Sequence, residues 1–248
     1  MIIKKNFKYS SMNYIDIDDI KDAEILYDSD DLVLLLDKSK ELAMLHFATN
    51  DFSPVVKAIA NIPDNLRLHF VPREYAAELS DLGFTEYAEW ADFWNYDIAK
   101  TASRISGGSQ PKFLTKSECE EVAAVSRQCE YQSRGFEAIP SEDFMELLND
   151  GNKVIIYQND SVIAGFCCVP IYNENTTLWI KAIAVDPEYQ GQGIGKKLMG
   201  QAIKYGSQSG ASKGFLASDL LNTNAHSLFM KFGFHPKETD TELQMIRQ

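Results

Sequence analysis

A glycine-rich segment in the C-terminal half has residue types and spacing that suit the binding of phosphate groups. Its residues are Gln190, Gly191, Gln192, Gly193, Ile194 and Gly195. An apolar strand pattern ends before it at Val185, and a helix pattern opened by Lys196 and Lys197 follows it. Glycines let backbone N–H groups approach a ligand closely, and the positive end of a helix dipole lies behind them. The segment therefore predicts a pyrophosphate site, in which each lysine either contacts phosphate or lies in a solvated first turn.

Two common nucleotide motifs do not fit this segment. A dinucleotide-binding fingerprint needs GxGxxG with an acidic residue about 20 positions further on, whereas the spacing here is GxGxG. A Walker A loop needs Ser or Thr after its Gly-Lys pair, and Gly195-Lys196 is followed by Lys197. The phosphate site therefore belongs to neither class.

The segment resembles the acyl-CoA signature of the GCN5-related N-acetyltransferase (GNAT) family, which is Gln or Arg, two residues, Gly, one residue, then Gly or Ala. Gln190, Gly193 and Gly195 occupy those positions. The resemblance covers residues 111–248 in the expected order of elements, and it implies an α+β (mixed α/β) acyl-CoA N-acyltransferase fold. A second stretch resembles the late motif of the family, with Asn222, Ala225, Leu228, Phe229, Lys231, Gly233 and Phe234.

The resemblance also implies how acetyl-CoA is held. The backbone amides of Gly191–Lys196 would bind its pyrophosphate, the main chain of Ile183–Val185 would pair with the pantetheine arm, and Asn222 would face the cofactor. The acetyl group would pass directly to a substrate amine, while a backbone N–H near Ile183 polarises the thioester carbonyl. The implied cofactor-binding residues are Ile183, Ala184, Val185, Gln190, Gly191, Gln192, Gly193, Ile194, Gly195, Lys196, Asn222 and Phe229.

Two positions depart from the family pattern. Many members carry a Tyr that protonates the leaving thiolate where this chain has Phe229, and some carry a glutamate base where it has Trp179. A thiol of pKa about 8.5 is a tolerable leaving group, so loss of the acid slows the reaction without preventing it. No catalytic residue is therefore assigned. Each candidate carboxylate reads first as a solvated surface group, and water relays can serve as the base. The acceptor-side candidates are Glu130, Glu137, Trp179 and Asp219.

Hydrophobic periodicity predicts alternating helices and strands in this half. The predicted helices are 116–131, 140–150, 196–210 and 223–232, and the predicted strands are 153–159, 161–172, 176–185, 214–218 and 241–248. The first three strands read as an antiparallel meander. The glycine-rich segment then lies between the third strand and the next helix.

A stretch of glycine, serine and proline around residues 104–111 predicts a domain boundary. The chain is therefore divided into a domain at 1–104, a linker at 105–110 and a domain at 111–248. The first domain has a similar order of elements but lacks a glycine-rich loop, and Gly83 and Gly233 follow matching helices. This echo indicates either a degenerate GNAT-like copy, and hence tandem domains, or two independent helix caps. Its predicted strands are 31–37, 41–48 and 66–72, and its predicted helices are 53–62 and 73–82.

Aromatic residues gather at the end of the first domain. They alternate with acidic and small residues in a strand-like run, so packing in the core or between domains accounts for them. The alternative is that they and residues 130–139 form the wall of the acceptor site, where carboxylates would attract a cationic amine. These aromatic residues are Phe84, Tyr87, Trp90, Phe93, Trp94 and Tyr96.

Composition limits the function classes. The 248 residues have a formal net charge of −12, which disfavours binding to nucleic acid or an anionic membrane, and their 45% hydrophobic and 24% charged fractions are those of a globular protein. No apolar run approaches the ~20 residues of a membrane helix, and the first ten residues do not read as a secretory signal, which predicts a cytoplasmic protein. No metal or disulfide framework is expected, because the spacing required is absent among the histidines and among Cys119, Cys129, Cys167 and Cys168.

These observations predict an acyltransferase that moves an acetyl group from acetyl-CoA to a primary amine of a small molecule or peptide, as a monomer or homodimer. The alternative is a catalytically idle acyl-CoA-binding sensor or scaffold, and turnover with any amine distinguishes the two. A peptide-bond-forming aminoacyl transferase with duplicated domains would need a large basic surface for tRNA, which the charge disfavours.

Overall fold

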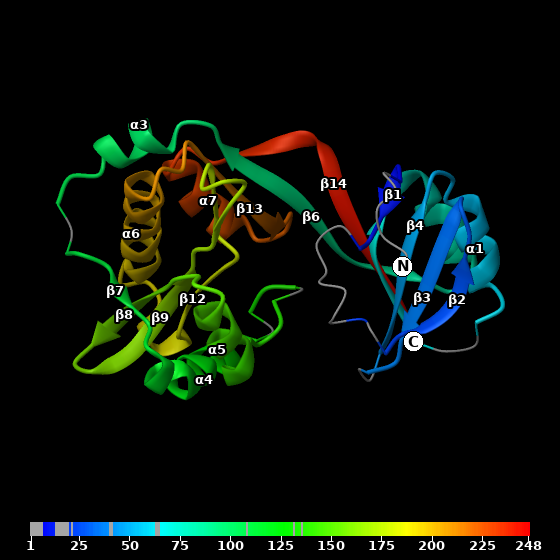
Figure 1. Cartoon of the computed structure of the whole chain (residues 1–248), viewed down its shortest axis with the longest axis horizontal. Coiled ribbons are helices and arrows are strands. Elements are labelled where there is room, and N and C mark those ends of the chain that lie inside the picture. Colours follow the sequence, from blue (N-terminus) through cyan, green and yellow to red (C-terminus); the bar gives the residue numbers. More distant parts are fainter. Residues whose placement is uncertain are drawn as a thin grey trace. The chain divides into compact units, whose positions relative to one another are not determined.

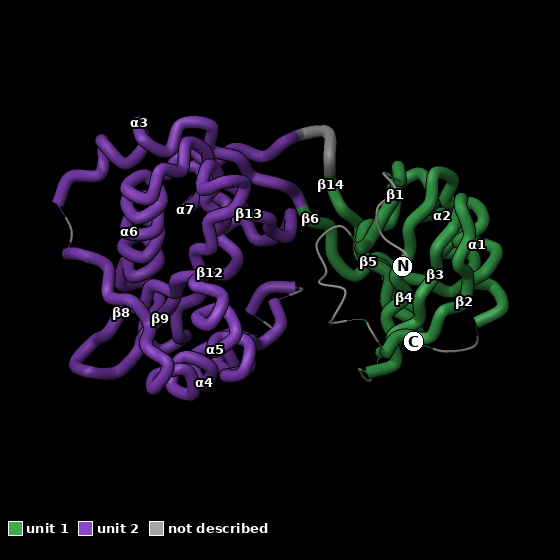
Figure 2. The backbone as a smooth tube through the Cα atoms, in the orientation of Figure 1, with its two compact units in different colours: residues 1–90, 241–248 green, residues 91–240 purple. Residues whose placement is uncertain are grey.

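The chain forms two compact units in a computed structural model, which describes residues 7–12, 20, 22–39, 42–62, 65–107, 109–130, 132–134 and 136–248, except for the side chains of residues 238–240. The first unit comprises residues 1–90 and 241–248, and the second comprises residues 91–240 (Figure 2). Strands β6 (Thr85–Asn95) and β14 (His235–Arg247) each contribute residues to both units (Figure 1). Within the described residues, no helix has the length and apolar character needed to span a membrane.

The first unit is a sheet with two short helices. Its strand order is β2-β3-β4-β5-β14, with β1 paired to β4, and β4 and β5 run parallel because α1 connects them. One face of the sheet packs with both helices in a hydrophobic core, to which β14 contributes Leu243 and Met245. A smaller core on the other face contains Val33, Leu35 and Ala48. The other elements of this unit are β1 (Tyr9–Ser10), β2 (Glu24–Asp28), β3 (Leu32–Asp37), β4 (Ala43–Thr49), α1 (Ser53–Ile59), β5 (Leu66–Val71) and α2 (Ala76–Asp81).

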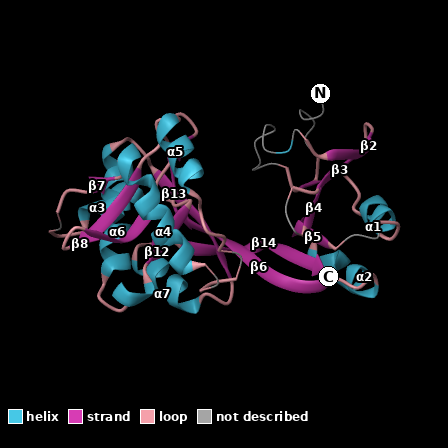
Figure 3. Ribbon diagram, turned by 90° about the horizontal axis from the view of Figure 1, so that it is seen from below, coloured by secondary structure: helices cyan, strands magenta, loops and turns pink. Residues whose placement is uncertain are grey.

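The second unit contains two sheets. One is antiparallel in the order β12-β9-β8-β7, and the other has the order β10-β11-β13-β6. Strands β6 and β14 lie side by side (Figure 3). The helices are α3 (Ile98–Ser103), α4 (Cys119–Cys129), α5 (Ser141–Asn149), α6 (Ile194–Gln208) and α7 (Thr223–Lys231). The strands are β7 (Lys112–Phe113), β8 (Val154–Asn159), β9 (Val162–Cys168), β10 (Ile171–Tyr172), β11 (Thr177–Trp179), β12 (Ala182–Val185) and β13 (Lys213–Asp219).

Side-chain alternation divides the second unit into two cores. On one face of the antiparallel sheet, Ile156, Phe166 and Cys168 pack with α4 and α5. On the other face, Ile155 and Cys167 pack with α6, α7 and the second sheet. Successive residues of a strand point to opposite faces, so the adjacent cysteines belong to different cores.

The predicted meander is wrong in its second and third strands, because residues 161–172 and residues 176–185 each divide between the two sheets. Strand β11 pairs in parallel with β13, whereas β12 pairs antiparallel with β9. The change falls between two residues, since Ile180 N donates to Phe215 O at 2.9 Å and Lys181 N donates to Cys168 O at 3.1 Å. Strands β12 and β13 therefore part at this point. The apolar pattern of the run indicates a strand but not which neighbour satisfies its main chain, so the division had no signal in the sequence.

The units also divide the chain at positions that differ from the predicted domains of 1–104 and 111–248. Residues 91–110 lie in the second unit, where Ile98 is fully buried and its N–H donates to Ser212 O at 3.1 Å. Glycine and serine at 104–111 mark the end of α3, which is an interruption inside the unit. The tandem relation of the two halves stays a prediction.

Candidate functional site

The glycine-rich segment forms a loop between β12 and α6. Asp186 begins it by accepting a hydrogen bond from Glu188 N at 2.9 Å, and Gly193 ends it as the N-cap of α6. Gly191 and Gly193 have φ values of 75° and 77°, a left-handed region that favours glycine. A methyl group at either position would meet no heavy atom within 4 Å, so the space beside them is open. The N-terminus of a 15-residue helix thus lies behind an open glycine loop, which suits an anion.

The two lysines of the first turn differ in their surroundings. Lys197 Nζ donates to Tyr157 Oη at 2.9 Å and lies 4.7 Å from the centre of the same ring. Lys196 is exposed, and within the described part of the chain no ion pair or hydrogen bond is recorded for its side chain. Lys196 is therefore the cation of this turn that is available to a phosphate.

The main chain of β12 offers hydrogen-bonding groups at the point where β12 and β13 part. Asp186 N donates to Ala164 O of β9 at 3.0 Å, and hydrogen-bonded residues alternate along an antiparallel strand. The N–H and C=O groups of Ile183 and Val185 therefore point away from β9. Val185 O accepts hydrogen bonds from Gln190 Nε2 at 3.0 Å and from Cys129 Sγ at 3.3 Å, which agrees with that direction. The main-chain groups of Ile183 and the N–H of Val185 remain for a strand-like ligand.

None of the four cysteines is disposed to act as a nucleophile. All four are buried and free. Burial raises the pKa of Cys129 to about 11, with the nearby Asp186 charge adding to the effect, and it raises the pKa of Cys168 to about 12. Burial also holds the pKa of Cys167 well above its usual range. The thiols stay protonated near neutral pH, so covalent catalysis through cysteine is disfavoured.

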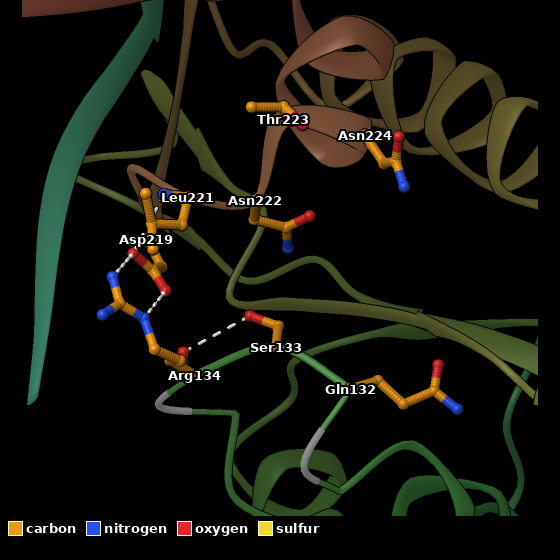
Figure 4. A pocket seen from close by; sticks show the side chains of 8 residues that line it. All are labelled: Gln132, Ser133, Arg134, Asp219, Leu221, Asn222, Thr223 and Asn224. Atoms are coloured by element: carbon orange, nitrogen blue, oxygen red, sulfur yellow. Dashed lines mark hydrogen bonds and ion pairs between the residues drawn. The ribbon is translucent and has the colours of Figure 1, made fainter.

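A cavity of about 250 Å³ lies at the end of β13 (Figure 4). At its wall, Arg134 forms a two-point ion pair with Asp219, with Nε to Oδ2 and Nη2 to Oδ1 both at 2.8 Å. Asp219 is 2% exposed, and its Oδ1 also accepts a hydrogen bond from Leu221 N at 3.1 Å. We call this ion pair the clasp. The lining residues are Gln132, Ser133, Arg134, Asp219, Leu221, Asn222, Thr223 and Asn224.

The clasp joins elements that are distant in sequence. Arg134 belongs to the α4–α5 connection, and Asp219 is the last residue of β13. A neighbouring contact runs from Gln190 Nε2 to Gln132 Oε1 at 2.6 Å, so the same connection also touches the glycine loop. Residues of the α4–α5 connection therefore contact both sides of the opening between β12 and β13.

The structure brings some of the predicted site residues together and leaves others apart. Asp219 and Asn222 both line the cavity, and Asn222 caps α7 by accepting a hydrogen bond from Ala225 N at 3.2 Å. Phe229 is 4% exposed and lies inside the core, where its ring centre is 5.9 Å from that of Phe93. Three of the four acceptor-side candidates do not line the cavity: Glu130 is half-buried at the end of α4, Glu137 is exposed, and Trp179 is half-buried in β11.

Sequence reasoning named the segment 130–139 as a possible wall of the acceptor site but singled out neither Arg134 nor Gln132. They lie in a segment without periodicity, and their partners are 85 and 58 positions away. No local pattern could identify either partner. The available signal was the position of Arg134 between Glu130 and Glu137, two carboxylates proposed for the acceptor side.

Comparisons with known proteins support an acetyltransferase relationship. Residues 118–234 match the family model described as Acetyltransferase (GNAT) family. A protein of Bacillus subtilis (strain 168), which bears the name "Putative ribosomal protein bS18-alanine N-acetyltransferase", is 30% identical over 82 residues. These residues are 33% of this chain and 53% of that protein, so the chain spans about half the length of this curated relative.

Solved structures share the fold over most of the chain. A functionally unknown conserved protein from Staphylococcus epidermidis ATCC 12228 has a TM-score of 0.60 and 12% identity over 96% of this chain and 99% of its own. The GCN5-related N-acetyltransferase from Sphaerobacter thermophilus has a TM-score of 0.59 and 11% identity, over 87% of this chain and 76% of its own. The GCN5-related N-acetyltransferase from Kribbella flavida has a TM-score of 0.58 and 15% identity, over 91% of this chain and 89% of its own. Identities this low establish similarity of fold alone.

The parting strands, the glycine loop at the start of α6 and these structural neighbours define a mixed α/β fold of the GNAT acetyltransferase type. The family assignment applies to residues 118–234, which form an acetyltransferase domain of the GNAT type.

Proposed function

We propose that the second unit binds acetyl-CoA and transfers its acetyl group to a primary amine of a small molecule or peptide. The observation that carries this proposal is the open loop of Gly191 and Gly193 at the start of α6, next to the unused main-chain groups of Ile183. The loop amides and Lys196 bind the pyrophosphate, because the helix dipole and a cation both favour negative charge there. The pantetheine arm lies along β12 in the manner of an added strand.

The chemical step is direct attack of the amine on the thioester carbon. The main-chain N–H of Ile183 donates to the thioester oxygen as negative charge develops on it, which is the oxyanion type of stabilisation. No ionisable side chain occupies the Phe229 position, so water takes up and delivers the protons. The relative from Bacillus subtilis is named for acetylating an alanine of ribosomal protein bS18, so peptide amines belong among the acceptors to be tested.

We also propose that the first unit is a degenerate copy of the same fold. In support, each unit has a parallel strand pair joined through a helix, β4-α1-β5 in the first and β11-α6-β13 in the second. A glycine with positive φ follows the next helix in both, at Gly83 and Gly233. The connection between β4 and α1, residues 50–52, contains no glycine, so this copy does not bind CoA. Four free thiols fit a reaction in the cytoplasm, where thiols stay reduced.

Calorimetric titration of CoA into the full chain tests the site. Gly193→Glu adds a bulky negative side chain in front of the helix, and we expect at least a 30-fold loss of affinity. Gly151→Glu is the matched control, because Gly151 also has a positive φ, 80°, and no heavy atom within 4 Å of a methyl group there. Both variants bear the same backbone strain, so equal CoA affinity in the two would contradict the assignment.

A second function keeps the same cofactor site without chemistry. Phe229, which supplies no proton and is buried in the core, favours an acyl-CoA-binding sensor. Release of free thiol from acetyl-CoA, measured with polyamines, aminoglycosides, amino acids and peptides, separates the two. Amine-dependent release supports the transferase, and CoA binding without release supports the sensor.

A further inference from the structure

An aromatic strip crosses the second sheet of the second unit. The ring centre of Phe215 lies 6.4 Å from that of Trp179 and 4.9 Å from that of Trp94. Trp94 in turn stacks on Tyr96, with ring centres 5.8 Å apart and an interplanar angle of 10°. Tyr172 extends the strip with an edge contact to Trp179 at 6.3 Å. Tyr96 is 72% exposed, and the other four rings are half-buried. Five rings from four neighbouring strands or their ends thus form one continuous surface.

The strip lies on the same face of β13 as the clasp carboxylate. Along this strand Leu216 points into the core, whereas Phe215, Ala217 and Asp219 alternate with it and point to the other face. Ala217 is exposed and small, so it leaves the path between them clear. Four residues of a strand span about 13 Å, which is therefore the separation of Phe215 from Asp219 along β13.

Two lysines give the strip a positive charge. Lys213 Nζ lies 5.6 Å from the centre of the Trp94 ring, and Lys181 Nζ lies 5.6 Å from the centre of the Trp179 ring. Among the described residues, no carboxylate ion pair is recorded for either lysine. In a chain of net charge −12, two cations without carboxylate partners on one aromatic surface favour an anionic group there.

We propose that the aromatic strip is the platform that selects the acceptor, and that the acceptor is a primary amine on a short chain that bears an aromatic ring and a carboxylate. This inference rests on the proposed acetyl transfer. The acceptor ring packs on Phe215 and Trp94, and its carboxylate pairs with Lys213 or Lys181. Its amine then reaches the thioester beside Ile183, where β12 and β13 part. A second cationic group on the acceptor would be repelled by the two lysines, so polyamines are poor substrates.

The transfer itself balances without any further reactant. The amine nitrogen forms a bond to the acetyl carbon, and the bond from that carbon to sulfur breaks. The proton lost from the amine passes through water to the departing sulfur. The products are an N-acetylated aromatic acid and CoA with a free thiol.

Dipeptides with an N-terminal glycine test the platform, because they keep the amine constant and vary the ring and the charge. The probes are glycyl-phenylalanine, glycyl-alanine, glycyl-lysine and glycyl-phenylalanine amide, titrated by calorimetry into the full chain with and without CoA. We expect glycyl-phenylalanine to bind about tenfold more tightly than glycyl-alanine, since ring packing and apolar burial add to one another. Glycyl-lysine should bind most weakly.

Variants assign these preferences to the strip. Phe215→Ala should remove the advantage of glycyl-phenylalanine over glycyl-alanine, and Trp94→Leu should reduce it. Lys213→Gln should weaken glycyl-phenylalanine severalfold but leave its amide unchanged. Tyr27→Ala is the matched control, because Tyr27 is an aromatic residue of β2 in the first unit that is 52% exposed. A thermal melt of each variant verifies folding.

The outcomes separate this proposal from the proposed function. Binding that follows the ring and depends on Phe215 supports the platform even if no dipeptide is acetylated, in which case the transferase proposal is the one that fails. Acetylation of glycyl-phenylalanine and glycyl-alanine with equal KM, unchanged by Phe215→Ala, overturns the platform and leaves the transferase intact. Absence of binding by every dipeptide also overturns the platform.

Discussion

The clasp between Arg134 and Asp219 gives an asymmetric prediction. Replacing Arg134 with Gln leaves the Asp219 carboxylate 2% exposed and without its cation. Replacing Asp219 with Asn removes the negative charge but keeps an oxygen that accepts from Leu221 N. The Arg134 side chain is 41% exposed and can turn to water when its partner is lost. The two substitutions break the same ion pair, but only one strands a buried charge.

The expected magnitudes follow from this difference. An uncompensated buried carboxylate costs about 3 kcal/mol, so R134Q should lower the free energy of unfolding by that amount. D219N loses hydrogen-bond strength with an exposed partner, which costs about 1 kcal/mol. In a chain of this size these values correspond to a fall in Tm of roughly 6–12 °C and 2–4 °C respectively. The double variant should be more stable than R134Q alone, because it no longer contains the stranded charge.

Urea unfolding followed by circular dichroism measures these free energies, and a constant denaturant slope verifies that stability alone has changed. The order R134Q, then the double variant, then D219N, from least to most stable, is the expected result. Equal losses in the two single variants would refute the reasoning, as would a double variant less stable than R134Q.

Two further predictions concern the frame around the site. A methyl group on Gly165 would lie 2.8 Å from Ala184 O and 3.2 Å from Leu198 Cδ1, so Gly165→Ala should cost about 2 kcal/mol by urea unfolding. An unchanged midpoint would contradict that close approach. A hydrogen bond from Lys112 is the main cause that lowers the pKa of Glu118 from 4.5 to about 2. A lowered carboxyl pKa stabilises the folded state above pH 4.5, and the effect is lost as the pH falls toward 2. Glu118→Gln should therefore cost about 1 kcal/mol at pH 7, given the exposed Lys112, and little at pH 2; a cost that does not vary with pH would count against the assignment.

Sequence alone predicted the elements around the glycine loop well, because their signals are local. The predicted helices 196–210 and 223–232 correspond to α6 (Ile194–Gln208) and α7 (Thr223–Lys231). The exposed strand β2 was missed, since Ile25 and Tyr27 face solvent and its pattern does not alternate. Local patterns report burial along one element and carry no information about its neighbours.

The clasp and the opening between β12 and β13 could not be predicted from the sequence, because local patterns do not identify distant contacts. Asp219 was a candidate on the acceptor side, but nothing near it in sequence points to Arg134, its partner 85 positions away. The division of residues 176–185 at Ile180 depends on which strand each backbone group meets. Both features arise from contacts between distant parts of the chain.

The unit boundaries also depend on distant contacts. Strand β6 follows α2 of the first unit yet neighbours β13, and β14 follows α7 of the second unit yet pairs with β5. The composition at 104–111 could not reveal this exchange of strands. A fragment cut there would separate residues 1–104 from the strand that completes their sheet.

The exchanged strand β14 also sets the order in which the chain can fold during synthesis. Leu243 and Met245 are 1% and 0% exposed in the core of the first unit, which is otherwise built from residues 1–90. At 5–20 residues per second, the ribosome takes about 8–30 s to make the intervening 150 residues. During that time the edge of β5 has no partner strand and attracts other unpaired strands. The core of the first unit is therefore incomplete until Leu243 and Met245 have been synthesised.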